Sequence, residues 1–300
     1  MMRCGKASVC TWVATATFWL NAAGAGAEEA APVVLPEVVV TPLRMEAAPG
    51  EVPYASHVVA LTALGQNAPR TTPAALRALP SVMVQKTSYG QGSPFLRGFT
   101  GFRTLMMVDG IRLNNSTFRD GPNQYWNTVD PWSVDRYEVV MGPASVLYGS
   151  DAVGGAVNAL TLVPPAWTGQ PVYERNLSYR GATADESHQA RAGIRAQVNE
   201  KLGFTGGYTW KDFGDVEGGD DVGEQEHTGY DEYDFDLRAD YAVARDTTLT
   251  LAHQQVEQDD AWRTHSTIYG IAWEGLKKGD DQMRAYDQDR ALTYLRLANK

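Results

Sequence analysis

Apolar and polar residues alternate one by one over long stretches in the second half of this 300-residue chain. The clearest stretch covers residues 233–243, where aromatic and aliphatic residues hold the odd positions and mostly charged residues the even ones. Shorter stretches of this kind lie at 190–198, 204–211 and 248–252. Successive side chains of a β-strand point to opposite faces, so a period of two predicts strands with one apolar and one polar face. A soluble β-sandwich and a transmembrane β-barrel share this period.

The lengths of the connections favour the barrel. Short joins at 199–201 and 244–246 alternate with long polar stretches at 181–189, 211–232 and 256–289. Outer-membrane barrels have tight turns on the periplasmic side and long loops outside, which gives this alternation of short and long. We therefore expect residues 171–300 to form antiparallel transmembrane strands.

The N-terminus has the order of a secretory signal peptide. Arg3 and Lys6 precede an apolar run, and Ala25–Gly26–Ala27 follows it, which predicts cleavage after Ala27. Both cysteines of the chain, Cys4 and Cys10, fall inside residues 1–27. The exported protein is thus expected to have neither a disulfide nor a reactive thiol.

Charge and motif content exclude several classes of protein. A formal net charge of −10 argues against a nucleic-acid binder, because phosphate neutralisation needs a basic surface. The sequence contains no nucleotide-binding loop, catalytic triad or zinc-ligand spacing, so we expect no enzyme, no cofactor and no built-in metal site. The acidic residues at 215–226 indicate a solvated outer loop, and calcium binding by this loop is the alternative.

Residues 28–50 form a linker that contains one β-forming run. Prolines, among them Pro32, Pro36 and Pro42, and many alanines and valines make the linker extended and unsuited to a core. The run at 37–42 (EVVVTP) is suited to pairing with the sheet edge of another protein, with an ordinary edge strand as the alternative.

Residues 51–165 have the pattern of a compact α+β domain. Thr72–Pro73 predicts the start of a helix that runs through residues 74–79 and is stopped by Pro80. Strand-like runs follow at 81–85, 105–108 and 137–141, and Asp109–Gly110 predicts a two-residue turn. Prolines 164 and 165 close the domain.

These motifs together resemble the TonB-dependent receptors. The run at 37–42 looks like the TonB box, and residues 79–82 (LPSV) resemble the helix exit of the receptors' plug domain. Residues 95–99 (FLRGF) and 105–114 (LMMVDGIRLN) resemble the middle hairpin of the plug, and residues 134–158 are similar to its closing signature. Two positions depart from the family's pattern: Met141 replaces an arginine, which puts one plug–barrel ion pair in doubt, and Ser81 replaces a glycine.

The resemblance implies an α+β plug domain at 51–165, followed by antiparallel transmembrane β-barrel strands from 171 onward. Barrels of the family have 22 strands, and residues 171–300 supply about six, so we expect an incomplete barrel from a fragment or a truncated chain. The implied location is the bacterial outer membrane, with plug and linker facing the periplasm. The implied partners are the TonB energy-coupling protein and outer-membrane lipid.

The resemblance also assigns site residues. The TonB-binding segment is Glu37, Val38, Val39, Val40, Thr41 and Pro42. Candidate ligand-binding residues are aromatic, amide and arginine side chains of two plug loops: Tyr89, Gln91, Phe118, Arg119, Asn123, Gln124, Tyr125 and Trp126. Packing of those loops against the barrel wall is the alternative. Charged plug residues suited to a polar barrel lumen are Arg97, Arg103, Arg112, Arg136 and Glu138.

Active uptake of a ferric siderophore, haem or cobalamin is the function that the resemblance implies. The alternatives are a non-transporting surface protein, such as an adhesin or phage receptor, and a non-functional remnant. The TonB-box-like run together with a complete plug favours uptake.

Overall fold

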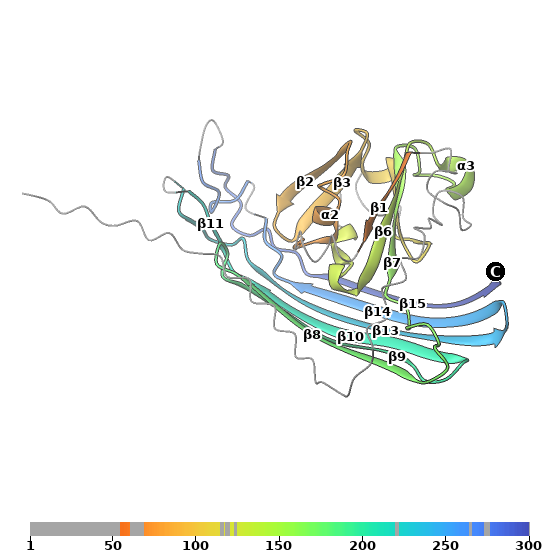
Figure 1. The fold of residues 1–300 in the computed structure, drawn as a ribbon. Coiled ribbons are helices and arrows are strands. Elements are labelled where there is room, and N and C mark those ends of the chain that lie inside the picture. Colours follow the sequence, from red (N-terminus) through yellow and green to blue (C-terminus); the bar gives the residue numbers. More distant parts are fainter. Residues whose placement is uncertain are drawn as a thin grey trace, which may run out of the picture.

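The computed structural model describes residues 55–60, 69–114, 117, 121–122, 125–219, 222–263, 266–272 and 277–299. An N-terminal domain, up to the end of a strand at Thr161, stands on the concave face of a long curved sheet that begins at Val172 (Figure 1). We call this long sheet the wall. No helix in the described part of the chain is long and apolar enough to span a membrane.

The N-terminal domain is built on a five-stranded mixed sheet. Its strand order is β1 (Ala55–Ala60), β6 (Val134–Met141), β7 (Gly155–Thr161), β4 (Thr104–Val108) and β5 (Ile111–Arg112). The β4–β7 pair is parallel and the other pairs are antiparallel. Asp109 and Gly110 join β4 to β5 with φ angles of 50° and 83°, which confirms the predicted two-residue turn.

A separate hairpin and several short helices complete the domain. The hairpin pairs β2 (Val82–Ser88) with β3 (Gln91–Leu96). The helices are α2 (Thr72–Ala75), η2 (Gly101–Arg103), η3 (Tyr125–Thr128), η4 (Pro131–Ser133) and α3 (Ser145–Tyr148). The helix expected through residue 79 is shorter than predicted, because Leu76 already caps α2 and turns follow it. Pro80 also disfavours helical geometry in the residue before it.

The core of the N-terminal domain lies on both sides of its sheet. Buried side chains of β4, β6 and β7 pack with Leu76, Leu96 and Trp126 into one cluster. Met141, where the family pattern has an arginine, is 3% exposed and belongs to this apolar cluster. The closing signature therefore contributes an apolar contact at this position.

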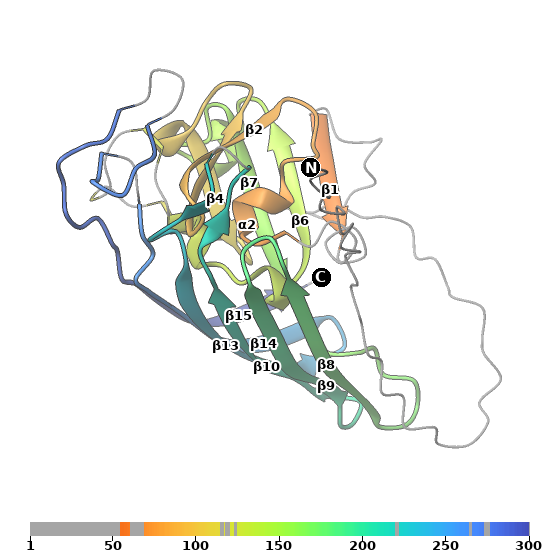
Figure 2. The same cartoon turned by 90° about the vertical axis from the view of Figure 1, so that its left-hand side faces the viewer.

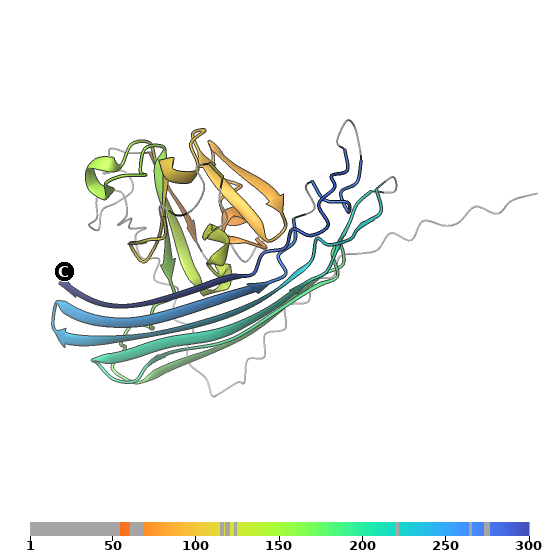
Figure 3. The ribbon, with the colours of Figure 1, turned by 180° about the vertical axis from the view of Figure 1, so that it is seen from behind.

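Six long antiparallel strands form the wall. In sheet order they are β15 (Gln288–Asn299), β14 (Thr247–Asp259), β13 (Tyr230–Ala244), β10 (Leu202–Phe213), β9 (Ser187–Gln197) and β8 (Val172–Ala182). A short hairpin of β11 (Val216–Glu217) and β12 (Glu224–Gln225) lies in the connection between β10 and β13. Figures 2 and 3 show the wall as an open, curved sheet beneath the N-terminal domain. The expected antiparallel, barrel-type strands are thus present.

The two faces of the wall differ sharply in polarity. On β13, Phe235, Leu237 and Tyr241 are exposed, and they alternate with residues that face the N-terminal domain. The alternate residues of the same strand, such as Asp234 and Arg238, are buried on the other face. The period of two in the sequence therefore separates an apolar outer face from a polar inner face, as in membrane barrels.

Gly155 allows the close approach of β6 and β7. It has φ of +155°, and a Cβ placed on it would collide with the Val140 carbonyl and approach Leu96.

We expect Gly155→Ala to lower the free energy of unfolding by about 2–4 kcal/mol, through overpacking and backbone strain. Urea unfolding of the chain in detergent micelles measures the change. Gly92→Ala, on β3, is the matched control, since its Cβ meets only ordinary contacts of 3.4 Å or more. Equal losses in both variants would contradict the assignment.

Candidate functional site

The N-terminal domain contacts the wall through a buried carboxylate, Asp130. This residue precedes η4 and accepts a hydrogen bond from the Trp132 backbone N–H at 3.0 Å, as an N-cap does. Its second oxygen accepts a hydrogen bond of 2.7 Å from the Thr209 hydroxyl on β10. Asp130 is thus fixed by its own domain at one oxygen and by the wall at the other.

Lys211, on β10, brings a buried positive charge to the same place. Its ammonium lies 2.9 Å from an oxygen of Asp130 and 2.9 Å from one of Asp234, and it also contacts Glu232. The side chain is 0% exposed. A lysine is almost never fully buried unless it is paired. Three carboxylates, one from the N-terminal domain and two from β13, provide that pairing.

Arg191 adds a second cation from β9. It donates to Asp130 at 3.3 Å, to Thr209 at 2.9 Å and to Asp236 at 2.6 Å. To reach Asp236 on β13 its guanidinium crosses β10 above Gly207, where a Cβ would collide with the Arg191 guanidinium. The glycine makes room for the arginine. We call Asp130, Arg191, Thr209, Lys211, Glu232, Asp234 and Asp236 the Asp130 cluster.

The surroundings of Asp130 determine its protonation. Burial alone would raise the pKa of this carboxyl, but the Lys211 and Arg191 charges and the hydrogen bonds from Lys211 and Trp132 lower it further than burial raises it. The net effect holds the pKa of Asp130 below its usual range. The carboxylate is therefore ionised at neutral pH, where it balances part of the buried positive charge.

Hydrogen bonds extend the cluster across the wall. Gln258 on β14 donates to Glu232 at 2.6 Å, and Gln288 on β15 donates to Gln258 at 2.8 Å. With Lys211, these residues lie in one row of the strand register on the inner face. The row orients Glu232 toward Lys211 because its other oxygen is held by Gln258.

Three further contacts attach the N-terminal domain to β15. Asp109 accepts a 2.7 Å hydrogen bond from the Tyr294 hydroxyl, and its side chain also accepts from the backbone and hydroxyl of Thr161. The Thr128 carbonyl accepts from Arg290 at 2.5 Å. Leu292 packs against the apolar core of the domain.

The β2–β3 hairpin tip also contacts the wall side of the molecule. The Arg70 guanidinium lies between the rings of Tyr89 and Phe213, at 4.1 and 4.7 Å from their centroids. Gln91 donates to the Ala261 carbonyl at 3.5 Å. Burial is the main cause that lowers the pKa of Arg70. In this structure Tyr89 and Gln91, two of the predicted ligand-binding residues, occupy a packed contact with the wall.

The structure describes only part of the other predicted ligand-binding loop. Phe118, Arg119, Asn123 and Gln124 lie outside the described residues, as does the side chain of Tyr125. The predicted signal peptide and residues 37–42 also lie outside them. Trp126 is 0% exposed and packs in the apolar core, so its ring is closed off from any ligand in this conformation.

The charged residues predicted to face the barrel make contacts within their own domain. Arg112 donates to Asp151 and to the Tyr148 carbonyl, and Arg136 donates to Glu138 at 3.1 Å. The Arg97 guanidinium lies beside Gly142. Arg103 is exposed on the N-terminal domain.

The contacts that do join domain and wall were not singled out in the sequence. On the domain side they come from Asp109 and Asp130, and on the wall side from Arg191, Lys211 and Arg290. One signal was available: cationic residues on the polar face of predicted barrel strands require partners inside the lumen. Nothing in the sequence identified which carboxylates those partners would be.

The acidic outer loop is organised by backbone hydrogen bonds. Asp215 accepts from the backbone N–H groups of His227, Thr228 and Gly229. Burial raises the pKa of Asp215, and these three hydrogen bonds lower it by more. Among the described residues, the acids grouped closely enough to hold a metal ion are Asp130, Glu232 and Asp234, and the Lys211 ammonium contacts all three.

The wall has the two-faced antiparallel strands of a membrane β-barrel. The N-terminal domain is held by polar groups on the inner face of the wall, as a plug would be. The family profile described as TonB-dependent Receptor Plug Domain matches residues 48–156. The N-terminal domain is therefore a TonB-dependent receptor plug domain, and the chain as a whole is similar to TonB-dependent receptors. We use the name plug for this domain below.

The chain is similar to several outer-membrane proteins, but each match covers only part of the relative's length. It is 30% identical over 156 residues to the Vitamin B12 transporter BtuB of Vibrio vulnificus (strain CMCP6), covering 51% of this chain and 24% of that protein. It is 35% identical over 118 residues to the Iron-regulated outer membrane virulence protein of Vibrio cholerae, covering 37% and 18%. The chain thus spans about a quarter or less of the length of these relatives.

Solved structures share the fold. The P. aeruginosa FpvA receptor bound to heterologous pyoverdines matches with a TM-score of 0.65 at 14% identity, covering 88% of this chain and 34% of the receptor. The Copper transporter OprC matches with a TM-score of 0.57 at 17% identity, covering 68% and 30%. At such identities the likeness concerns the fold alone.

Gly207→Ala tests the path of Arg191 across β10. The added methyl group would displace the guanidinium from Asp236 and Asp130, so we expect a loss of about 1–3 kcal/mol in the free energy of unfolding. Gly206→Ala on the same strand is the control, because its Cβ meets the Asp236 carbonyl and Leu237 only at 3.3 and 3.4 Å. Urea midpoints in detergent micelles compare the two. A larger loss at 206 than at 207 would contradict the assigned role.

Asp130→Asn tests the charge of the plug carboxylate. Lys211 and Arg191 would lose a buried counter-charge, which should cost about 3 kcal/mol in the free energy of unfolding at pH 7. Asp135→Asn, at a partly exposed pair with Arg136, should cost less than about 1 kcal/mol. Because the pKa of Asp130 is lowered, its contribution is present at neutral pH and is lost as the pH falls through that value. The difference between native protein and Asp130→Asn should therefore shrink in acid, and a constant difference would refute the electrostatic account.

Proposed function

We propose that this chain takes part in energy-coupled uptake of a scarce ligand across the bacterial outer membrane. The observation that carries the proposal is the contact between plug and wall. The plug rests on the inner face through Asp130, Asp109 and the Thr128 carbonyl, all of which bind polar wall residues. The outer face of the same wall exposes apolar residues such as Leu237 and Leu295, as lipid contact requires.

The relatives' names support the proposed ligand class. One relative is named as a vitamin B12 transporter and another as an iron-regulated outer-membrane protein. We propose a ferric siderophore, haem or cobalamin as the cargo, bound at plug loops that include Tyr89, Gln91, Phe118, Arg119, Asn123, Gln124, Tyr125 and Trp126. The tip of the β2–β3 hairpin would then have to exchange its contact with Phe213 and Ala261 for the ligand.

The domain order and location are part of the same proposal. Residues 1–27 direct export, residues 28–50 form a periplasmic linker, residues 51–165 form the plug, and the strands from residue 171 onward lie in the outer membrane. Residues 37–42 bind TonB by adding a strand to its sheet edge, which couples inner-membrane energy to the plug.

Val39→Pro tests the coupling segment. Proline lacks the backbone N–H that a paired strand donates, so we expect uptake to fall to the level of a strain without TonB while ligand binding to whole cells is retained. Val33→Pro, a valine of the linker outside residues 37–42, is the control and should transport normally. Growth under iron limitation, and separately with cobalamin as the limiting nutrient, measures uptake. Normal growth of the Val39→Pro strain on both would overturn the proposal.

A further inference from the structure

One short segment of the plug supplies partners to three cations of the wall. Asp130 binds Lys211 and Arg191, and the carbonyl of Thr128, two residues earlier, accepts from Arg290. When the plug leaves the wall, these three cations lose their plug partners together. The free energy of that step depends on what the wall can offer them instead.

Two charged groups of the wall have incomplete hydrogen bonding while the plug is in place. An oxygen of Asp234 lies 2.9 Å from the Lys211 ammonium, yet neither carboxylate oxygen has a hydrogen bond within the described structure. The Nη1 atom of Arg290 is buried and likewise has no hydrogen-bond partner there. Its Nε and Nη2 atoms bind the Thr128 carbonyl and Gln254. Buried charged groups without full partners are costly, which points to a second arrangement in which they are satisfied.

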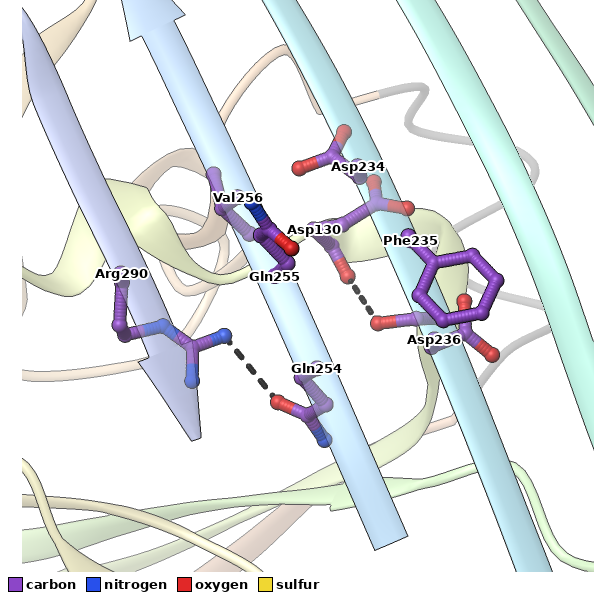
Figure 4. Close-up of a pocket in the computed structure, with 9 residues that line it drawn as sticks. Asp130, Asp234, Phe235, Asp236, Gln254, Gln255, Val256 and Arg290 are labelled. Atoms are coloured by element: carbon purple, nitrogen blue, oxygen red, sulfur yellow. Dashed lines mark hydrogen bonds between the residues drawn. The ribbon is translucent and has the colours of Figure 1, made fainter. Parts of the chain in front are cut away.

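Asp234 and Arg290 line the same narrow cleft (Figure 4). Val256 separates them in the strand register, since it pairs with Asp234 on one side and with Arg290 on the other. An arginine of this wall already spans such a separation, because Arg191 on β9 crosses β10 to bind Asp236 on β13. Arg290 on β15 is likewise two strands away from Asp234 on β13, with Val256 rather than a glycine between them.

The count of charges supports an exchange of partners. With the plug in place, the carboxylates of Asp130, Glu232, Asp234 and Asp236 face the cations of Arg191, Lys211 and Arg290. Without Asp130 the wall retains three acids and three bases. These six wall residues are therefore balanced among themselves, and Asp130 of the plug adds one negative charge to them.

We propose that Asp234 and Arg290 are positioning residues that form an ion pair with each other when residues 128–130 leave the wall. The new pair replaces the hydrogen bond between Arg290 and the Thr128 carbonyl. Glu232 remains paired with Lys211, and Asp236 remains paired with Arg191. The exchange lowers the free energy of plug release without weakening the wall. It rests on the proposed function in one respect, namely that the plug moves.

Labelling of the variant Ser133→Cys measures plug release. Ser133 is 6% exposed and lines the cleft, so a maleimide can reach Ser133→Cys only when the segment opens. The labelling rate is measured on the full chain in outer membranes, in dilute urea, without ligand or TonB. Asp234→Asn, Arg290→Gln and the double variant form a double-mutant cycle, carried out once with native Asp130 and once with Asp130→Ala.

The two backgrounds give the same expectation for the pair. With Asp130 present, the pair exists only in the open state, so the cycle should show a coupling of about tenfold in labelling rate that favours opening. With Asp130→Ala, the Thr128 carbonyl still holds Arg290 while the segment is closed, so labelling should be faster overall and the coupling should persist. Absence of coupling with native Asp130, or its loss in the Asp130→Ala background, would overturn the proposal.

A conservative variant separates charge from shape. Arg290→Lys keeps the positive charge, so in the native background it should label within about threefold of the unsubstituted protein, whereas Arg290→Gln should label more slowly. A role confined to holding the Thr128 carbonyl would instead make Arg290→Gln label faster, and this result would refute the exchange. Uptake is not measured, so a failure of transport and a failure of the ion-pair exchange give distinct results.

Discussion

The burial of the Lys211 charge is the constraint around which plug and wall are arranged. An ammonium with no exposed surface is stable only inside a shell of carboxylates, because removing it from water costs several kcal/mol. Asp234 and Glu232 of the wall provide two of these carboxylates, and the third, Asp130, comes from the plug. A plug that carried no acid at this position would leave the wall with a poorly compensated charge. The register of the plug on the wall therefore follows from one ion cluster.

The alternation of apolar and polar side chains along the wall strands places the residues of this cluster on the inner face. Because side chains alternate along β13, the same eleven residues at 233–243 supply an apolar surface on one side and charged side chains on the other. The inner side chains bind one another in rows across the strands, as Glu232, Gln258 and Gln288 do. Many inner side chains of the wall are consequently bonded to one another as well as to the plug. The plug adds Asp130 to a network formed by residues of β9, β10 and β13.

The sequence predicted the elements better than it predicted the contacts. Alternation and loop length identified the wall strands, and Asp109–Gly110 identified its turn, because both signals are local. The contacts between plug and wall join residues far apart in the chain, such as Asp130 with Lys211, and no local pattern encodes such a pairing. Arginines of the plug were an obvious choice for contacts with a polar lumen. Among the described residues, Arg112 binds Asp151 and the backbone carbonyls of Tyr148 and Ser150 within the plug.

A polar contact between plug and wall has a physical consequence for movement. An apolar interface of the same size loses its full burial energy when it opens, since exposed methyl groups gain nothing from water. Hydrogen bonds and ion pairs exchange their partners for water molecules or for one another, so their net contribution to stability is small compared with their strength. The Asp130 cluster holds the plug in one register because a misplaced charge is costly, and the proposed pairing of Asp234 with Arg290 would allow release by giving Arg290 another partner. Specific placement and reversible removal thus arise from the same residues.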